Sequence, residues 1–306
     1  RDRSPSRGLG DVYKRQRQKL ILGTVQFGQP YGVANPNGQV PKDDLQQILE
    51  KAHQLNITTL DTAIAYGESE KVLGQQDLQD FKVISKLFKI PDNCSDITDW
   101  VEQQVQGSLA RLQVDSLEGL LLHRPAQLLG NGGQELYQAI QCLKARGVVK
   151  RIGLSMYGYQ ELHEVIDNVD ADFDIIQVPI NLFDRRLDSL GLLKKLKSKG
   201  VEVHARSAFL QGLLLMPEEN VPSYFAPWKD IFKSYHHWLN ANNISALQAC
   251  LGYLNQHPDI DKIIVGVDNL AQLNEIAAAI DTATKAPPLE LQSADEGLIN
   301  PSRWQL

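Results

Sequence analysis

The sequence has few cysteines and no long apolar runs. Its 306 residues contain three cysteines, Cys94, Cys142 and Cys250, which are widely spaced and odd in number. This usage argues against a disulfide framework and a zinc site, and it is typical of a reducing compartment. No apolar run approaches the roughly 18 residues of a membrane-spanning helix, and no apolar stretch of the kind found in signal peptides precedes Lys19. We therefore expect a soluble cytoplasmic protein with no metal site and no membrane partner.

An excess of positive charge is also missing. The chain has 31 Lys and Arg against 37 Asp and Glu, for a net charge of −6, and no basic stripe. Nucleic acid is therefore not an expected partner. The composition does not predict an oligomeric state.

Residues 1–18 differ from the rest because they are basic, rich in Ser and Gly, and without hydrophobic periodicity. They could be a functional basic tail, but the composition favours a disordered leader or an expression artefact. We expect the folded domain to span 19–306.

From Lys19 onwards, short apolar runs alternate with segments of helical periodicity. The apolar runs do not alternate with polar residues, which is typical of strands buried on both faces. Eight such units predict a single-domain (β/α)₈ barrel of the TIM type. An open doubly wound sheet is the alternative, but no GxGxxG follows the first strand. The expected strands are 20–24, 58–63, 82–86, 117–123, 152–156, 174–179, 201–207 and 262–267. The expected helices are 43–56, 68–75, 96–112 (with Ser95 as N-cap), 134–146, 159–168, 188–199, 228–241, 245–256 and 269–280.

Four ionisable residues follow or end successive strands: Asp61, Tyr66, Lys86 and His123. Barrel active sites lie at the carboxyl ends of the strands, so these side chains should share one rim. A lysine at about 4 Å stabilises a phenolate by roughly 4 kcal/mol at an effective dielectric of about 20, and desolvation opposes this. Tyr66 would then be a general acid that protonates a carbonyl oxygen, with Asp61 holding Lys86 and His123 orienting the carbonyl. Each residue alone has an ordinary structural explanation, but their joint order and spacing favour chemistry.

These segments resemble the aldo-keto reductase superfamily. LDTAIAYG is similar to the family's Asp-Thr-Ala and Tyr-Gly segment, ISK to its lysine strand, and LLLHRP to its histidine strand. The resemblance covers about Lys19 to Ile280. It implies that Asp61, Tyr66, Lys86 and His123 are the catalytic tetrad, and that the chain reduces a small-molecule aldehyde or ketone with a nicotinamide dinucleotide.

The resemblance also implies cofactor contacts. They begin with Gly23 and Thr24 beside the nicotinamide, and with Ser155 and Gln177 at its carboxamide. Met156 replaces the usual Asn, and Arg206 replaces an aromatic that stacks on the nicotinamide ring. The loop expected at the pyrophosphate contributes Ser207, Leu210, Gln211 and Gly212.

The segment IIVGVDNLAQLNEI resembles the family's adenosine-binding segment, with Gly266, Asn269, Gln272 and Glu275 at the contact positions. Relatives specific for NADPH usually place Lys or Arg here to pair with the 2′-phosphate. This chain has Gly266 and Gln272, with Asp268 close by. We expect NADPH from the family, with NADH as the alternative.

Two other functions stay open. One is a non-enzymatic redox sensor or regulatory subunit that binds the cofactor, and the other is a barrel aldolase with Lys86 as Schiff-base nucleophile. The loops expected to set specificity are 25–38, 88–95, 124–133 and 208–227, together with the tail. Their aromatic residues could line a pocket or cover the barrel; they are Phe27, Tyr31, Tyr224, Phe225 and Trp228. Arg124 could meet an anionic substrate or be an exposed strand-end charge.

Overall fold

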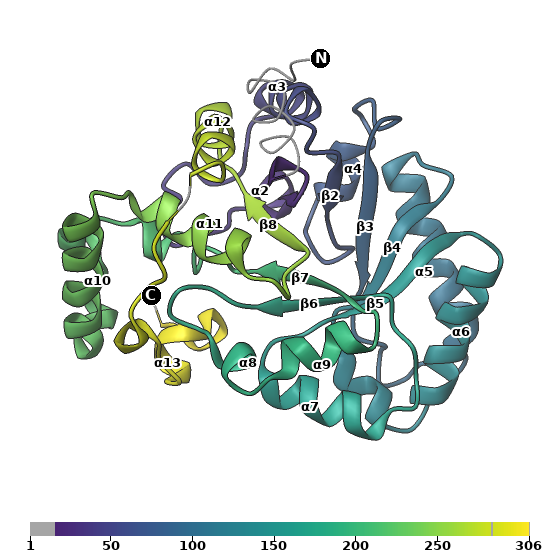
Figure 1. Cartoon of the computed structure of the whole chain (residues 1–306). Coiled ribbons are helices and arrows are strands. Elements are labelled where there is room, and N and C mark those ends of the chain that lie inside the picture. The colour runs from purple at the N-terminus through teal and green to yellow at the C-terminus, as the bar shows by residue number, and fades with distance from the viewer. Residues whose placement is uncertain (1–15, 283, 306) are drawn as a thin grey trace, which may run out of the picture.

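Eight parallel strands close into a barrel, each paired with the next along the chain and β8 paired with β1 (Figure 1). The computed structural model describes residues 16–282 and 284–305. The predicted (β/α)₈ barrel is confirmed. The strands are β1 (Leu20–Gly23), β2 (Thr59–Asp61), β3 (Lys82–Leu87), β4 (Leu117–Leu122), β5 (Val149–Ser155), β6 (Ile175–Pro179), β7 (Glu202–Arg206) and β8 (Lys262–Gly266).

Helices follow the strands and cover the outside of the barrel. Their apolar faces pack on the sheet, as the spacing of the leucines and isoleucines predicts. The helices are α2 (Val25–Gly28), α3 (Lys42–Gln54), α4 (Ser69–Leu73), α5 (Ile97–Leu112), α6 (Gly133–Ala145), α7 (Tyr159–Asn168), α8 (Arg186–Ser189), α9 (Leu192–Ser198), α10 (Lys229–Asn242), α11 (Ala246–Gln256), α12 (Leu270–Ala279) and α13 (Glu296–Ile299).

Two local expectations are wrong. The helix expected at 188–199 is divided into α8 and α9, because Gly191 between them has a φ of 69°, outside the helical region. The N-cap of α5 is Asp96 and not Ser95. The Asp96 carboxylate accepts a hydrogen bond from the backbone N–H of Asp99 at 2.8 Å, which satisfies a donor left free at the helix start.

The inside of the barrel is filled by branched aliphatic side chains. Ile21, Ile84, Leu121 and Ile175 form one buried cluster, and Ile264 packs against it. They come from strands around the barrel, so they close its interior. The open space above them, at the carboxyl ends of the strands, is where a ligand can reach the strand-end residues.

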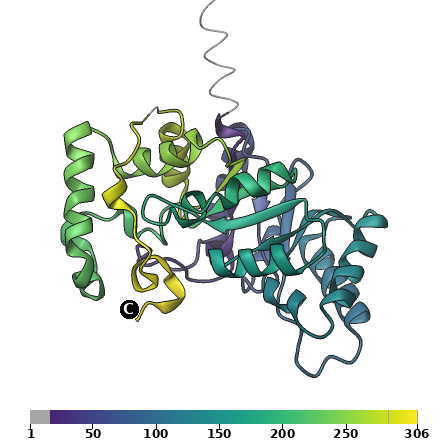
Figure 2. The same cartoon turned by 60° about the horizontal axis from the view of Figure 1, so that its bottom comes forward.

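A second apolar cluster lies beside the barrel and includes the end of the chain. Phe225 and Phe232 pack there with Leu291 and Leu298, and the Phe225 ring lies 5.0 Å from that of Trp304. Figure 2 shows α10 and the C-terminal segment together on this side of the molecule, away from α5 and α6. Phe225 therefore belongs to this cluster and covers the barrel.

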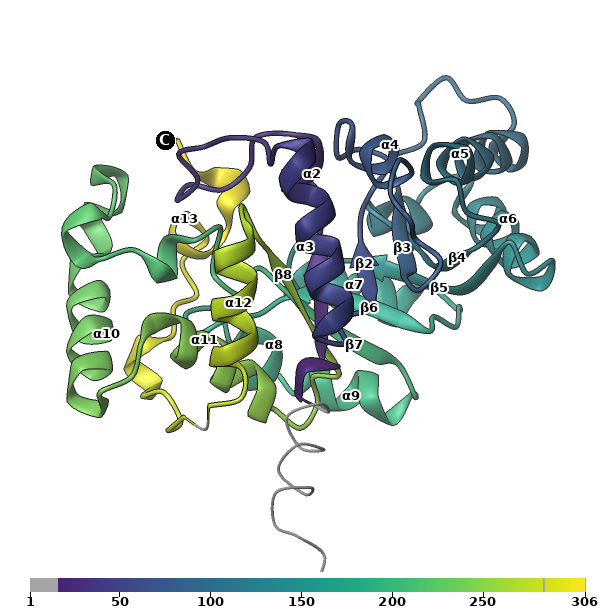
Figure 3. The same ribbon diagram turned by 90° about the horizontal axis from the view of Figure 1, so that it is seen from above.

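The two ends of the barrel sheet meet where β1 pairs with β8, and there α3 and α12 lie side by side (Figure 3). The predicted leader falls mostly outside the described residues. Within its described part, Arg17 forms an ion pair with Asp281 at 2.6 Å. Among the described helices, none is both long and apolar enough to cross a membrane.

Candidate active site

The four polar strand-end residues lie together at the carboxyl-terminal rim of the barrel. Asp61 is the last residue of β2, and Lys86 lies in the neighbouring strand β3. His123 directly follows β4, and its backbone N–H donates to the carbonyl of Leu87 at 2.9 Å. Tyr66 lies in the turn between β2 and α4. Adjacent parallel strands thus bring together residues that are far apart in sequence, as expected for a barrel.

Lys86 and Asp61 form a buried ion pair. The Lys86 ammonium lies 2.6 Å from Asp61 Oδ2 and donates to the carbonyl of Thr62 at 2.8 Å. Lys86 is 1% exposed and Asp61 is 3% exposed. The Gln177 amide donates to the other oxygen, Asp61 Oδ1. Burial lowers the pKa of Lys86, and the charge of Asp61 opposes this shift. Such a pair is tolerable because each charge has its partner and further hydrogen bonds.

Tyr66 lies beside this pair. The Lys86 Nζ is 4.9 Å from the centre of the Tyr66 ring, and the His123 ring lies 5.9 Å away at an interplanar angle of 79°. Burial raises the pKa of Tyr66 well above its usual range, and the negative charge of Asp61 adds to the effect. This direction is opposite to the one expected from Lys86 alone, because desolvation of the phenolate is the larger effect here. Tyr66 is therefore a firmly protonated hydrogen-bond donor.

His123 lies among positive charges. Burial lowers the pKa of His123 to about 3, and Lys86, Arg206 and Arg124 add to the shift. The imidazole is therefore neutral near pH 7. Its ring stacks on Tyr157 with centroids 6.1 Å apart, and sequence reasoning did not identify this tyrosine. Its signal in the sequence is its position two residues after the end of β5.

Two guanidinium groups lie against the ring of Tyr157. The Cζ of Arg124 is 4.4 Å from the ring centre, and that of Arg206 is 4.9 Å away. Arg206 also donates from Nε to the carbonyl of Met156 at 3.2 Å, which fixes its position at the end of β7. The guanidinium of Arg206 therefore stacks on an aromatic side chain of the protein itself.

A cavity of about 330 Å³ extends from Tyr66 along the rim to β8 and α12. Most of the residues predicted for the tetrad and the cofactor line it. They are Gly23, Thr24, Asp61, Tyr66, Gln177, Arg206, Ser207, Gln211, Gly212, Gly266, Gln272 and Glu275. Other lining residues, including Gln26, Tyr31 and Phe209, were not assigned a cofactor contact from the sequence. Tyr31 thus lines the cavity, whereas Tyr224 and Phe225 pack with the C-terminal segment.

Five predicted residues do not line the cavity. Lys86 and His123 contact Tyr66 instead. Ser155 is buried at the end of β5, and Leu210 is buried in the second apolar cluster. The Asn269 side chain caps α12 by accepting from the backbone N–H of Gln272 at 3.0 Å.

The loop after β7 has an unusual backbone. Ser207, Leu210, Gln211 and Gly212 all have positive φ values, of 58°, 50°, 55° and 90°. Non-glycine residues in this region are strained, and such strain is concentrated at functional sites. Turns of this kind can direct backbone N–H groups towards an anion. This loop is therefore suited to hold the phosphates of a dinucleotide.

The cavity contains buried acceptors without donors. Within the described chain, Gln177 Oε1, Gln26 Oε1 and Asp268 Oδ1 are buried and have no hydrogen-bond partner. All three residues line the cavity, Gln177 beside the ion pair and the other two at its far end. These atoms lie beneath the cavity surface. The amide and hydroxyl side chains that line the cavity and the positive-φ loop after β7 fit the carboxamide, ribose and phosphates of a nicotinamide dinucleotide.

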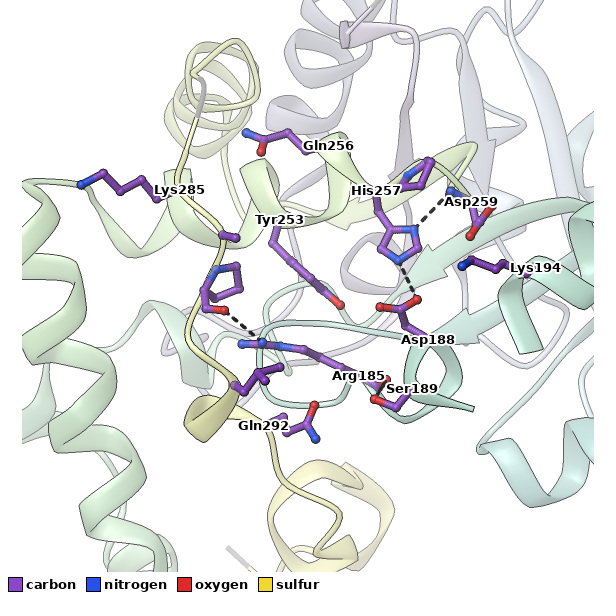
Figure 4. A pocket seen from close by; sticks show the side chains of 14 residues that line it. Arg185, Asp188, Ser189, Lys194, Tyr253, Gln256, His257, Asp259, Lys285 and Gln292 are labelled. Atoms are coloured by element: carbon purple, nitrogen blue, oxygen red, sulfur yellow. Dashed lines mark hydrogen bonds and ion pairs between the residues drawn. The ribbon is translucent and has the colours of Figure 1, made fainter. Parts of the chain in front are cut away.

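A second cavity, of about 500 Å³, lies outside the barrel between α8, α11 and the segment 285–292 (Figure 4). It shares no lining residue with the rim cavity among the described residues. His257 pairs there with Asp188 at 3.2 Å, and Arg185 donates to the carbonyls of Leu182 and Pro287. Arg185 Nη2, Tyr253 Oη and Asp259 Oδ2 are buried without a partner among the described residues. None of the residues predicted for the site lines it, so the rim cavity is the candidate active site.

Comparison with known proteins agrees with this geometry. The family model described as "Aldo/keto reductase family" matches residues 19–290. The chain is 28% identical over 302 residues to L-galactose dehydrogenase of Arabidopsis thaliana, covering 92% of each protein. It is 26% identical over 316 residues to human aflatoxin B1 aldehyde reductase member 2, covering 90% of this chain and 84% of that protein.

Solved structures show the same fold. The holo form of an aldo-keto reductase of Bacillus halodurans superposes with a TM-score of 0.69 at 20% identity, covering 88% of each chain. Because the family model covers most of the chain, we conclude that this protein belongs to the aldo/keto reductase family, a family of oxidoreductases.

Proposed function

We propose that the chain interconverts an aldehyde or ketone and the corresponding alcohol, with Tyr66 as the general acid. The observation that carries this proposal is the buried Lys86–Asp61 pair directly beside Tyr66, which itself lines the cavity. A nicotinamide dinucleotide, held by Gln177 and the loop after β7, supplies the hydride when bound.

The residues divide the proton chemistry among them. Neutral His123 donates a hydrogen bond to the carbonyl oxygen and so orients it. Tyr66 keeps its proton while the substrate is a carbonyl, because burial raises its pKa. It gives the proton up when a strongly basic alkoxide forms on the substrate, and the nearby Lys86 charge stabilises the phenolate left behind. Asp61 keeps Lys86 charged and in position.

The printed names of two relatives suggest a class of substrate to test first. L-galactose dehydrogenase and the D-threo-aldose 1-dehydrogenase of a Pseudomonas species are both named for sugars. In this chain Tyr31 and Phe209 line the cavity and could stack on a sugar ring. We therefore propose sugars and sugar-derived aldehydes as the first substrates. The relatives' names leave the direction of the reaction open.

The test is the Tyr66→Phe variant. This change removes the proton donor and keeps the ring, so turnover should fall by about 10²- to 10⁴-fold while the dissociation constant of the cofactor stays unchanged. Turnover is measured by nicotinamide absorbance over a panel of aldoses and simple aldehydes. Undiminished turnover by the variant would refute the assignment of Tyr66.

The surroundings of Lys86 support this role over that of a Schiff-base nucleophile. Its ammonium already donates to Asp61 and to the carbonyl of Thr62. A nucleophilic amine would have to lose a proton and leave Asp61 unpaired in a buried position, which is costly. A redox sensor differs from the proposed enzyme in one measurable respect, since it would bind the cofactor without turning over any carbonyl in the panel.

A further inference from the structure

The far end of the rim cavity is acidic. Asp268 and Glu275 line it there, together with Gln26, Gly266 and Gln272. Among the described residues that line the cavity, Arg206 is the one positively charged side chain. It donates to the carbonyl of Met156 and stacks on Tyr157. A dinucleotide whose nicotinamide lies beside Tyr66 must therefore place its adenosine half near carboxylates.

Asp268 is held in a fixed position by Gln272. The backbone N–H of Asp268 donates to Gln272 Oε1 at 2.8 Å, and Gln272 Nε2 donates to Asp268 Oδ2 at 3.3 Å. Both polar atoms of the Gln272 amide are thus occupied. The other carboxylate oxygen, Asp268 Oδ1, is buried, and the side chain of Gln26 lies beside the carboxylate. The carboxylate is therefore fixed at this end of the cavity, where its charge acts on a ligand that enters.

The amide of Gln26 lies at the same end of the cavity, against Gly266. A Cβ at position 266 would lie 2.4 Å from Gln26 Nε2 and 2.6 Å from Oε1, so the amide of Gln26 occupies the space that a side chain at Gly266 would need. Its Oε1 is also buried without a partner. The absence of a side chain at Gly266 therefore allows a residue from α2 to reach the segment between β8 and α12.

Two carboxylates and no cation select between two ligands. A ribose with a free 2′-hydroxyl has no charge at that position, so the carboxylates do not repel it. A 2′-phosphate offers acceptors and about two negative charges, which Asp268 and Glu275 would repel. Phosphate is normally met by Arg or Lys, and a free ribose hydroxyl by a carboxylate.

We infer that this chain binds NADH in preference to NADPH, because Asp268 and Glu275 disfavour a 2′-phosphate at this end of the cavity. The inference rests on the proposed use of a nicotinamide dinucleotide. It departs from the family-based expectation of NADPH, which did not take the charge of this end of the cavity into account.

The test measures binding without a carbonyl substrate. The full chain is titrated with NADH and with NADPH at one salt concentration, and the dissociation constants are obtained from protein fluorescence. We expect NADH to bind at least about tenfold more tightly. Asp268→Ala removes one repelling charge, so NADPH should bind about 3- to 10-fold more tightly, with little change in the dissociation constant of NADH.

Two further variants keep the test decisive if Asp268→Ala does not fold. Asp268→Asn preserves the shape and removes the charge, so it should narrow the preference for NADH. Asp268→Ser combined with Gln272→Arg supplies a cation and should make NADPH the tighter ligand. Asp80→Asn is the matched control, since it removes one exposed negative charge away from the cavity and should change neither constant.

The outcomes separate two failures. Tighter binding of NADPH by the unmodified chain, or an unchanged ratio of the two dissociation constants in both the Ala and the Asn variants, would overturn the role of Asp268. No binding of either dinucleotide would instead overturn the proposed function.

Discussion

The two ends of the rim cavity are built differently. At the Tyr66 end, Lys86 and Asp61 are buried charges from neighbouring strands, and they neutralise each other. At the far end, Asp268 is half-buried beside a helix start, and no Lys or Arg lines the cavity there among the described residues. Charge is balanced within the protein at the first end and unbalanced at the second. Substitutions at the first end should therefore affect stability as well as turnover, and those at the second should affect affinity alone.

The largest effect is expected at the buried ion pair. Lys86→Met leaves the Asp61 carboxylate buried without its partner, so the free energy of unfolding should fall by about 3 to 5 kcal/mol, with turnover lost. Urea denaturation followed by fluorescence measures the free energy of unfolding. Lys89→Met is a matched control on the same rim, because Lys89 forms an exposed pair with Asp92, and the free energy of unfolding should not change measurably. Equal losses in the two variants would contradict the comparison.

Backbone support of Tyr66 can be tested at Gly28. A Cβ there would lie 1.9 Å from the carbonyl oxygen of Tyr66 and 2.4 Å from the backbone nitrogen of Ser69. Gly28→Ala should therefore displace the turn that carries Tyr66, lower the free energy of unfolding by about 1 to 3 kcal/mol and reduce turnover. Gly158→Ala is the control, since a Cβ at that position meets nothing within 4 Å. A fully active Gly28→Ala protein would show that the turn position is not critical.

The low pKa of His123 predicts a dependence of stability on pH. The folded chain holds this pKa at about 3, below the ordinary value of about 6.5, so the unfolded state binds more protons between these values. The stability contributed by the neutral imidazole is fully present above about pH 6.5 and is lost as the pH falls towards 3. This loss amounts to about 1 to 2 kcal/mol at pH 5. His123→Asn should make unfolding free energies less steep with pH across this window. An unchanged slope in urea titrations at pH 4 to 7 would count against the low pKa.

The smallest stability effect is expected at the far end. Asp268→Asn keeps both hydrogen bonds with Gln272, so the free energy of unfolding should change by no more than about 0.5 kcal/mol. Thermal or urea unfolding without cofactor measures this change. A loss of several kcal/mol would mean that Asp268 stabilises the fold itself, and the contrast between the two ends would then disappear.

The Tyr66 end could be predicted from the sequence because strand order determines it. Asp61 ends one strand and Lys86 lies in the next, so the regular pairing of a barrel places them together. The far end could not be predicted in the same way. Gln26 reaches Gly266 only because β1 and β8 close the barrel, and a contact over that distance leaves no local pattern. The direction of the Tyr66 pKa shift was missed for a related reason, since a sequence gives the neighbouring charge but not the degree of burial.

The apolar cluster beside the barrel has a consequence for the order of folding. It joins Leu210, Leu213 and Leu214 of the loop after β7 to Leu291 and Leu298 near the end of the chain. A ribosome releases these last residues after every strand has been made, and barrel strands can pair before then. The loop that carries Ser207 and Gln211 can therefore reach its final packing only after Leu291 and Leu298 have been made.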